Sequence, residues 1–567
     1  MDNVRFIGSV DQIKGELILL VFLDITLVIY SIFYLSLFFT DYSFICPTIS
    51  INNILVPSLG LVGLLLLRWL VNKNSFKNSI FVSFYLKLKD INDKNLVIFL
   101  AGLAFLFFAF ISILRHYSLL SAGYDLGIFD QGVWNCAHGN PLFCTIKYTQ
   151  GGSLLGDHFE PILFFIAPVY FIWPNVLVLL ILQPLLLASA LIPLYLIGKS
   201  VLKDRFLIFA FLMCYILSKP VRGIVYFDFY PEAFMVPALF WGYYFLIKRN
   251  NLLLWLSIIV VLLCKEDTTF LVLALGLYAL LVQQRRWLGI SFIAVAVLLW
   301  WIETGHIIPY FSPMHNYEYL SKLPFGTSYL DNFKFCFFHP VQFAKFIFTK
   351  QKIDYMLRLF GPLGFLSLLS PSQFILNFIP LLKNLLGTSK SSIYYTINTH
   401  YVAGVIPFVF ISAIYGCHAL MQRLTIKNGS IIVGLFLIGI TLLFLGKTDG
   451  CRIAGFFNNM KINYTLQKIR ALDLIPSDAS VIATDNLCPH LSHRSIIYYL
   501  DPRGEQPLPK DMPEYIAIDK GQLTPMEAEV IDNYLSRAES KGYRVVSSIQ
   551  DNNFMILASS ESGKETK

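Results

Sequence analysis

Long apolar runs separated by short polar connections fill the chain from about residue 17 to about residue 445. A helix needs about 20 mainly apolar residues to cross a bilayer, and many of these runs reach that length. They lack the alternation of apolar and polar residues that is typical of strands in an outer-membrane barrel. The pattern therefore predicts an α-helical membrane protein with about 13 spans.

Lysine and arginine residues orient these spans, because cytoplasmic loops of membrane proteins are enriched in them. The first two predicted spans are Leu17–Phe39 and Ile54–Val71, and the connection after them is the most basic part of the chain: Arg68, Lys73, Lys77, Lys87, Lys89 and Lys94. We therefore place the N-terminus and this connection in the cytoplasm. The third predicted span, Leu96–Leu114, then carries residues 124–160 to the outside.

The apolar segment Leu252–Gln284 is too long for one span, and it is flanked by Lys248-Arg249 and by Arg285-Arg286. If both basic pairs are cytoplasmic, the chain must enter and leave the membrane on the same side. Its turning point is then Lys265-Glu266-Asp267, at or just below the outer surface. The same parity places Asp228 and Glu232 outside.

The sequence divides into four parts: two extra spans and a basic loop (1–94), a transmembrane domain with outward loops (95–446), an extracytoplasmic α/β domain (447–558) and a disordered tail (559–567). The α/β domain is predicted from short strands and one helix. The strands are Val481–Ala483, Tyr515–Ile518, Tyr543–Ile549 and Phe554–Ala558, and the helix is Thr524–Ser540. Thr524, Pro525 and Glu527 have the spacing of an N-cap, a first-turn proline and a capping box.

Composition supports a membrane protein, since only 14% of the residues are charged, against about 25% in an average soluble protein. The formal charge of +8 comes largely from short loops beside apolar runs, so we expect no nucleic-acid partner. The cysteines have no zinc-site spacing; Cys136 and Cys144 share one outward loop, as a disulfide or as two thiols. No Walker A, GxGxxG or GxSxG sequence is present.

Ionisable residues between apolar segments are candidate functional residues, because charge is costly there. Asp125 and Asp130 could serve as a general base or a metal ligand, or could cap a helix. Asp157 and Glu160 have the spacing of a capping box. A capping box does not need His158, so this residue is a separate candidate. Asp228 and Glu232, on either side of Pro231, could also be caps.

Structural salt bridging alone explains Lys265-Glu266-Asp267 poorly. A phosphate contact for Lys265 and a metal or proton-transfer role for Glu266 or Asp267 fit better. Parity places the cations Lys219 and Arg222 on the outer side, against the enrichment of Lys and Arg in cytoplasmic loops. Either that enrichment is imperfect here, or the two residues bind an anionic lipid head group.

At these residues the sequence resembles prokaryotic membrane proteins catalogued as domain of unknown function 2079, which are similar to type C (GT-C) glycosyltransferases. The matching stretches are Tyr124-Asp125-Leu126-Gly127 with Asp130-Gln131, His158-Phe159-Glu160-Pro161, Asp228-Phe229-Tyr230-Pro231-Glu232, Lys265-Glu266-Asp267, His400-Tyr401, Ile475-Pro476 to Asp478-Ala479, and Pro489-His490-Leu491 with Arg494. The resemblance covers about Leu96 to Ala558. One departure is Tyr230, where a His is expected, and it puts metal binding in doubt.

The resemblance implies a GT-C-like fold in the plasma membrane and transfer of a sugar from a polyprenyl-phosphate donor to a glycan, lipid or protein acceptor outside the cytoplasm, with inversion. Asp125 maps onto the essential acid of type C enzymes. The expected catalytic residues are Asp125, Glu266 and Asp267; the expected substrate contacts are Asp130, His158, Lys265, Arg222, His400 and Tyr401; the candidate ligands for a divalent cation, Mg²⁺ or Mn²⁺, are Asp125, His158 and Glu232.

Two other classes of function remain open. A transporter or flippase for a lipid-linked or anionic solute would also carry intramembrane charges and interrupted helices. An inverted internal repeat would favour it, and none is visible in the sequence. A non-catalytic scaffold is the third reading, and charged clusters that lie apart in space would favour it.

Overall fold

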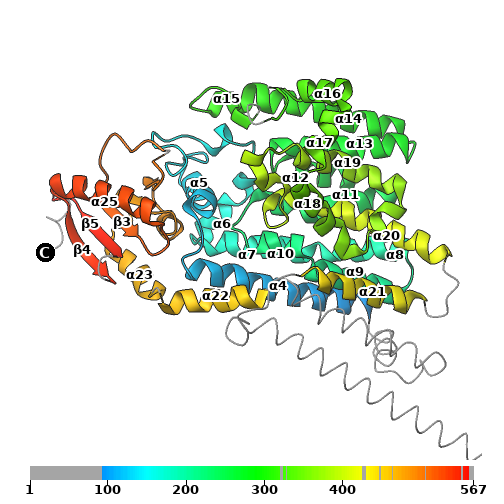
Figure 1. The fold of residues 1–567 in the computed structure, drawn as a ribbon, viewed down its shortest axis with the longest axis horizontal. Helices are drawn as coiled ribbons and strands as arrows, with labels where there is room; N and C mark the ends of the chain where they lie inside the picture. Colours follow the sequence, from blue (N-terminus) through cyan, green and yellow to red (C-terminus); the bar gives the residue numbers. More distant parts are fainter. Residues whose placement is uncertain are drawn as a thin grey trace, which may run out of the picture.

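The computed structural model describes residues 92–319, 323–326, 328–423, 429–445, 449–462, 464–504, 506–550 and 553–560. The first two predicted spans and most of the predicted tail lie outside these ranges. The helices form an elongated body, and a small α/β domain lies at one end of it (Figure 1). The described residues include the whole outward stretch from residue 124 to residue 160.

Three helical segments among the described residues are long and apolar enough to cross a membrane. They are α4 (Asp93–Tyr117), α7 with α8 (Leu177–Ser189 and Leu191–Val201), and α14 (Arg286–Ile302) with its continuation to Phe311. A fourth candidate is α9 (Arg205–Leu217) followed by α10 (Lys219–Val225), which meet at 43°. The expected count of about 13 spans is therefore not confirmed. Most other apolar runs form shorter helices, because prolines and polar turns interrupt them.

The long apolar segment between the two basic pairs does turn where the sequence indicates. It forms α12 (Asn251–Leu262) and α13 (Thr269–Leu281), separated by the short 3₁₀ helix η7 (Glu266–Thr268). α13 then packs closely on α14, because Gly276 and Gly289 face each other: a Cβ on Gly289 would lie 2.8 Å from the Gly276 carbonyl oxygen. The three consecutive charges at residues 265–267 thus sit at a helix break.

The rest of the helical body surrounds these elements. It comprises α11 (Met235–Ile247), α16 (Tyr329–Phe338), α17 (Pro340–Ile347), α18 (Lys350–Phe360), α19 (Pro371–Leu385), α20 (Ile406–Arg423) and α21 (Gly429–Leu443). α22 (Asp449–Ile462) runs beside α4, and α23 (Thr465–Ala471) follows it and leads to the α/β domain (Figure 1). The domain therefore lies at the same end of the body as the outward loop that follows α4.

The α/β domain is a five-stranded mixed sheet with strand order β2-β1-β3-β5-β4. β1 (Val481–Ala483), β3 (Tyr515–Asp519), β4 (Arg544–Ile549) and β5 (Phe554–Ala558) confirm the predicted strands. β2 (Ile497–Tyr499) was not predicted, since it has only three residues and pairs in parallel with β1. Helix α25 (Pro525–Ser540) has Thr524 as its N-cap, and the capping box with Glu527 is present as predicted.

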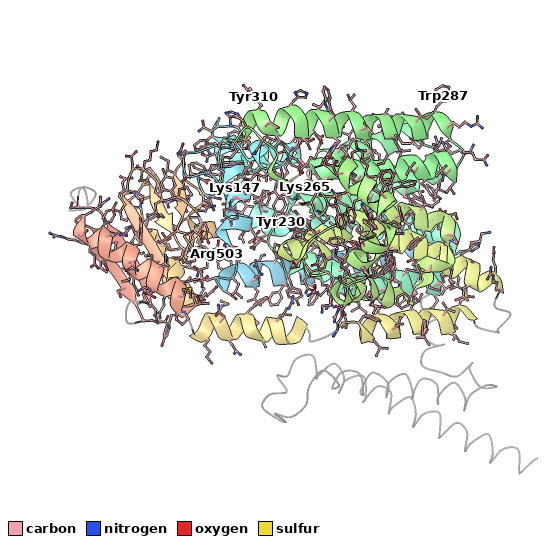
Figure 2. All side chains as sticks on the ribbon, turned by 45° about the horizontal axis from the view of Figure 1, so that its top comes forward. Lys147, Tyr230, Lys265, Trp287, Tyr310 and Arg503 are labelled. Carbon is pink, nitrogen blue, oxygen red and sulfur yellow. The ribbon has the colours of Figure 1, made fainter. Side chains whose placement is uncertain are left out.

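The α/β domain and the first outward loop share one hydrophobic core. Leu126 and Ile146 of the loop belong to the same buried cluster as Val481, Ile497 and Ile556 of the sheet. Burying apolar side chains from both parts favours one fixed arrangement over a loosely tethered domain. In Figure 2, Tyr230 and Lys265 lie at the end of the helical body that faces this junction, and Trp287 lies at the opposite end.

Candidate functional site

Asp125 lies in a tight turn, the π-helix η3 (Gly123–Gly127), between α4 and α5 (Ile128–Ala137). Its carboxylate accepts a hydrogen bond from the Tyr230 hydroxyl. Burial raises the pKa of Asp125 to about 7, and the neighbouring carboxylate of Asp228 adds to the rise. The alternative role as a helix cap is wrong, because Ala122 occupies the N-cap position. The turn thus presents an acid that changes charge near neutral pH.

Two further acids hold this turn in place. The Asp485 carbonyl oxygen accepts from the Gly123 N–H at 2.8 Å, and its Oδ1 accepts from the Tyr124 N–H at 3.2 Å. Asp228 accepts from the Ala122 N–H at 2.9 Å and forms an ion pair with Arg115. Asp485 belongs to the α/β domain, so that domain shapes the turn that carries Asp125.

Tyr230 connects Asp125 to the second charged cluster. Its ring stacks on the His400 ring with centroids 3.6 Å apart, and His400 Nε2 lies 3.7 Å from Glu232 Oε1. Lys265 Nζ donates to the same oxygen of Glu232 at 2.8 Å. The cap hypothesis for Asp228 and Glu232 is wrong, since Tyr230 is the N-cap of η6 (Pro231–Phe234) and no side chain caps that helix.

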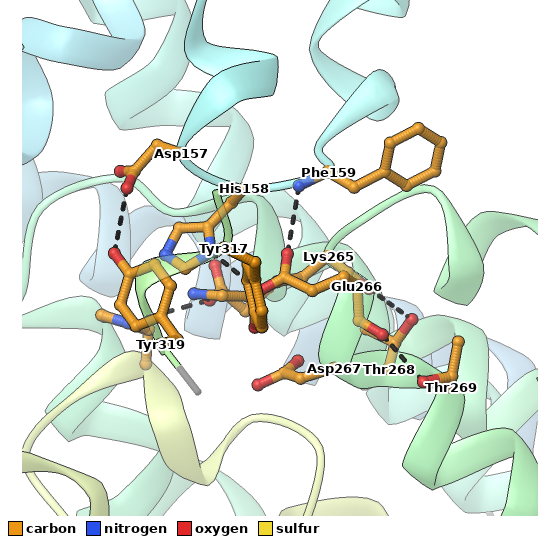
Figure 3. Close-up of polar contacts among 12 residues, drawn as sticks. Asp157, His158, Phe159, Lys265, Glu266, Asp267, Thr268, Thr269, Tyr317 and Tyr319 are labelled. Atoms are coloured by element: carbon orange, nitrogen blue, oxygen red, sulfur yellow. Dashed lines mark hydrogen bonds and ion pairs between the residues drawn. The ribbon is translucent and has the colours of Figure 1, made fainter. Parts of the chain in front are cut away.

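The three consecutive charges at the helix break each have a different partner. Lys265 pairs with Glu232, and Asp267 pairs with Lys383. Glu266 accepts from His158 Nδ1 at 2.9 Å, from the Phe159 N–H at 3.0 Å and from the Tyr317 hydroxyl at 2.9 Å (Figure 3). Burial alone would raise the pKa of Glu266, but the adjacent His158 outweighs burial and lowers it. Glu266 therefore stays ionised and fixes the His158 ring.

Asp157 does not form the expected capping box with Glu160. Its carboxylate pairs with Lys147 at 3.0 Å and accepts from the Tyr319 hydroxyl at 3.0 Å (Figure 3). Glu160 is the N-cap residue of η5 (Pro161–Phe165), but its side chain makes no capping hydrogen bond. Asp157 instead holds Tyr319, whose ring stacks on His158 with centroids 4.5 Å apart.

These groups surround a cavity of about 580 Å³. Two lysines, one histidine, two acids and four tyrosines form most of its lining: Lys265, Lys383, His158, Glu266, Asp267, Tyr317, Tyr319, Tyr394 and Tyr401. An adjoining pocket of about 330 Å³ is lined by Glu232, Asp267, Lys383, His400 and Tyr401, among others. Cations and aromatic faces in one cavity suit a ligand that carries both an anionic group and a sugar ring.

Sequence reasoning predicted Tyr401 but missed Lys383 and the other three tyrosines of this cavity, Tyr317, Tyr319 and Tyr394. Lys383 lies within the apolar run Phe374–Leu386, where an isolated charge is itself a signal. Tyr317 and Tyr319 lie in an outer loop whose His and Tyr content is visible in the sequence, but nothing there singles out these two residues. Their role depends on contacts with Glu266 and Asp157.

Asp130 does not line the cavity. Its carboxylate is fully buried and accepts from the Tyr170 hydroxyl, the Ser492 hydroxyl and His493 Nε2. Gln131 next to it donates to the carbonyl oxygens of Arg494 and Ser495. Asp130 therefore does not take the predicted position of a substrate contact. Its hydrogen bonds with Tyr170, Ser492 and His493 instead join the α/β domain to the first outward loop.

Arg222 also lies away from the cavity. It is buried in α10, and its Nε donates to the Leu217 carbonyl oxygen at 3.1 Å. The two cysteines of the first outward loop are free thiols, and Cys144 Sγ donates to Gln131 Oε1. Arg494 binds the carbonyl oxygens of Leu491, Pro476 and Ala479. The outer-domain stretches that carry the family resemblance thus shape the domain and its contact with the loop.

The family model described as "Predicted membrane protein (DUF2079)" matches residues 115–555. The chain belongs to this family. The match begins in the last turn of α4 and ends within β5, so it includes every residue of the site and nearly all of the α/β domain. The two N-terminal predicted spans lie outside it, as the sequence led us to expect.

Two crystal structures of ArnT from Cupriavidus metallidurans resemble this DUF2079 protein. The one bound to undecaprenyl phosphate has 12% sequence identity and a TM-score of 0.48, over 82% of this chain and 98% of that chain. The apo structure has 12% identity and a TM-score of 0.44, over 80% and 97%. No curated protein sequence matches the chain.

The residues expected to hold a metal ion in this DUF2079 protein do not form a ligand set. Asp125 binds Tyr230, His158 binds Glu266, and Glu232 binds Lys265. Among the described residues, no group of three or more His, Cys, Asp or Glu side chains is arranged to hold a metal ion. Tyr230, in the place of the expected His, gives Asp125 a hydrogen-bond donor instead. We therefore derive no step through a metal.

Proposed function

We propose that this membrane protein transfers a sugar from a polyprenyl-phosphate donor to an acceptor on the outer side of the membrane. The supporting observation is the contact of Asp125 with Tyr230, whose ring stacks on His400; His400 lines the pocket that adjoins the cavity with Lys265 and Lys383. A proton acceptor and a cationic cavity are the two parts that this transfer needs. The family resemblance points to the same reaction.

The cavity accounts for the donor side of the reaction. A sugar phosphate carries negative charge, and the Lys265 and Lys383 ammonium groups can stabilise that charge as it grows on the departing phosphate. Lys265 already pairs with Glu232, and Lys383 with Asp267. A bound phosphate would therefore share each ammonium group with an acid. The rings of Tyr394 and Tyr401 offer faces on which a sugar can pack.

Asp125 accounts for the acceptor side. The acceptor hydroxyl gives its proton to the Asp125 carboxylate, and its oxygen forms a bond to the anomeric carbon. The bond from that carbon to the phosphate oxygen breaks, and the lipid phosphate leaves with the electron pair, which inverts the anomeric centre. A base with a pKa of about 7 suits this role, since it is partly ionised at neutral pH and still basic enough to accept the proton.

Asp125→Asn tests the proposal, because it keeps the shape of the side chain and removes the base. The wild type and the variant are reconstituted in vesicles with radiolabelled polyprenyl-phosphate sugars and membrane acceptors, and the label in the acceptor is counted. We expect transfer to fall by about 10²–10⁴-fold. Asp532→Asn, at an exposed acid of α25, is the control and should leave transfer unchanged.

Two outcomes would contradict the proposal. Undiminished transfer by Asp125→Asn would remove Asp125 from the reaction. Movement of the labelled lipid between leaflets of the wild-type vesicles, with no sugar released from it, would instead identify a flippase.

A further inference from the structure

A second, larger cavity lies beside the first. It is open to solvent, has a volume of about 1010 Å³ and is lined by residues of α10, α18 and the segment 392–398. Lys219, Gln351, Asp354, Arg358, Tyr395 and Asn398 supply its polar and charged lining. None of these residues lines the cavity that holds Lys265, and the proposed transfer step uses none of them.

The segment 389–398 separates the two cavities. Tyr394 lines the first cavity and the adjacent Tyr395 lines the second. This wall is held against α10 at Gly223, where a Cβ would lie 2.4 Å from the Ile397 carbonyl oxygen. Any side chain at position 223 would push the wall away, so glycine permits the close packing. The second cavity is thus a fixed compartment that shares one wall with the first.

Positive charge dominates the second cavity. The charged groups that act on the Lys219 ammonium are Arg358, Arg452 and Arg222, opposed by the single carboxylate of Asp354. That carboxylate is already engaged, since Arg358 Nε donates to Asp354 Oδ2 at 2.6 Å. Lys219 makes no hydrogen bond or ion pair with any described residue. A half-buried cation among other cations lacks a counter-charge, and an anionic ligand would supply it.

The cavity also offers uncharged hydrogen-bonding groups. The buried Oδ1 of Asn398 has no hydrogen-bond partner among the described residues. Its carboxamide can rotate to present either an acceptor or a donor to a ligand. Gln351 and Ser392 line the same space, and Tyr395 contributes an aromatic ring. Amides, hydroxyls and an aromatic face beside a cation suit a sugar that carries an acidic group.

We propose that this cavity binds the acceptor through an anionic sugar, with Lys219 contacting its phosphate or carboxylate group. The acceptor role rests on the proposed transfer, whereas the binding does not. Two compartments with one shared wall would place donor and acceptor close together while keeping their charged groups apart. The anionic sugar can be the head group of a lipid or part of a soluble glycan, and the same chemistry would recognise both.

The test measures binding to the full-length protein in phosphatidylcholine nanodiscs, with no donor present. Radiolabelled glucose 1-phosphate is the anionic probe, and glucose is its neutral counterpart. We expect the wild type to bind glucose 1-phosphate and not glucose, Lys219→Gln to bind at least about tenfold more weakly, and Lys219→Arg to retain most of the affinity. Lys350→Gln is the matched control, because this exposed lysine lies on α18 outside the cavity lining and undergoes the same change of charge.

Lys383→Gln distinguishes the two cavities, since Lys383 lines only the first cavity and its neighbouring pocket. Binding that depends on Lys383 and not on Lys219 would overturn the proposal. If soluble glucose 1-phosphate does not bind, nanodiscs that contain glucuronosyl diacylglycerol, a lipid whose head group is an anionic sugar, test the lipid source. Enrichment of that lipid around the wild type but not around Lys219→Gln supports the proposal, and no Lys219-dependent binding in either arm overturns it.

The test also separates this inference from the proposed function. Asp125→Asn should bind glucose 1-phosphate as the wild type does, because binding needs no proton transfer. Lys219-dependent binding in a protein that transfers no sugar would leave the second site standing and overturn the transferase proposal. Sugar transfer whose acceptor KM is the same in the wild type and in Lys219→Gln would overturn the acceptor site and leave the transferase proposal standing.

Discussion

Asp125 and Asp130 are two acids five residues apart, the first half-buried and the second fully buried, and their surroundings are opposite. Asp130 accepts hydrogen bonds from Tyr170, Ser492 and His493, so its negative charge is fully compensated. Asp125 has the Tyr230 hydroxyl as its hydrogen-bond donor and lies near two other acids, Asp228 and Asp485. The first arrangement gives the carboxylate three hydrogen-bond donors, and the second makes ionisation of Asp125 costly.

This difference makes Asp125, and not Asp130, the candidate for a reactive acid. A carboxylate with several donors gains nothing from a proton, whereas one with acidic neighbours changes its charge readily near neutral pH. The α/β domain contributes neighbours to both acids. It supplies Ser492 and His493 to Asp130, and Asp485 to the turn that carries Asp125.

The largest effect on stability is expected from Lys265→Gln, because this change would leave the charge of the Glu232 carboxylate without its lysine partner. Lys265 and Glu232 are both buried, and removing one member of a buried ion pair costs about 3–5 kcal/mol. Thermal unfolding of the detergent-solubilised protein measures the loss. Lys520→Gln removes a lysine from a partly exposed pair with Asp532 and should change stability by less than about 1 kcal/mol. Equal losses in the two variants would show that burial does not decide the cost.

Asp130→Asn should lower the stability by about 2 kcal/mol, because the amide replaces an ionised acceptor of three hydrogen bonds. Burial lowers the pKa of His493, but the Asp130 carboxylate outweighs burial and raises it. A histidine with a raised pKa in the folded state contributes most below its unfolded pKa, and that contribution is lost as the pH rises through the folded value. The cost of Asp130→Asn should therefore be largest in mild acid. Unfolding curves at several pH values test this, and a cost that grows with pH would refute it.

Asp125→Asn should behave in the opposite way in the same unfolding experiment. The pKa of Asp125 is raised to about 7 in the folded protein, so folding favours the protonated form and the wild type loses stability as the pH rises toward that value. Asparagine carries no charge at any pH. The variant should therefore be as stable as the wild type in acid and more stable above about pH 7. A variant that is less stable at every pH would place Asp125 among the structural acids.

Thr524→Ala should cost about 1 kcal/mol, since it removes the N-cap of α25. Thr524 accepts from the Glu527 N–H and donates to the Glu527 side chain. This capping box lies within the α/β domain and touches neither acid, so sugar transfer should persist when the domain is still folded. Hydrogen exchange of α25 measures the local loss. Transfer that falls as far as in Asp125→Asn would mean that domain stability limits the reaction.

The smallest effect is expected from Asp485→Asn on the pH dependence of transfer. The wild-type rate should rise with pH through about 7 as Asp125 ionises. Asp485 contributes less than burial and Asp228 to the raised pKa of Asp125, so its neutralisation should move this limb of the pH profile modestly to lower pH. A move to higher pH would contradict the electrostatic account of the turn.

The sequence by itself determined the helical membrane character, the helix break at residues 265–267, four of the five strands and the capped helix of the α/β domain. These features depend on local patterns of apolar residues, turns and caps, which a linear sequence records directly. It also indicated which charged clusters are candidates for function, because charge between apolar segments needs an explanation.

Only the tertiary structure decided what each acid does. Asp125 and Asp130 are the same residue type in one short stretch, and their difference lies in donors and acids that come from residues 170, 228, 230, 485, 492 and 493. The tyrosines and Lys383 of the first cavity, and the separate cavity beside Lys219, likewise depend on segments far apart in the chain. Hydrogen bonds and charge interactions act over a few ångströms of space, and distance along the sequence does not record that proximity.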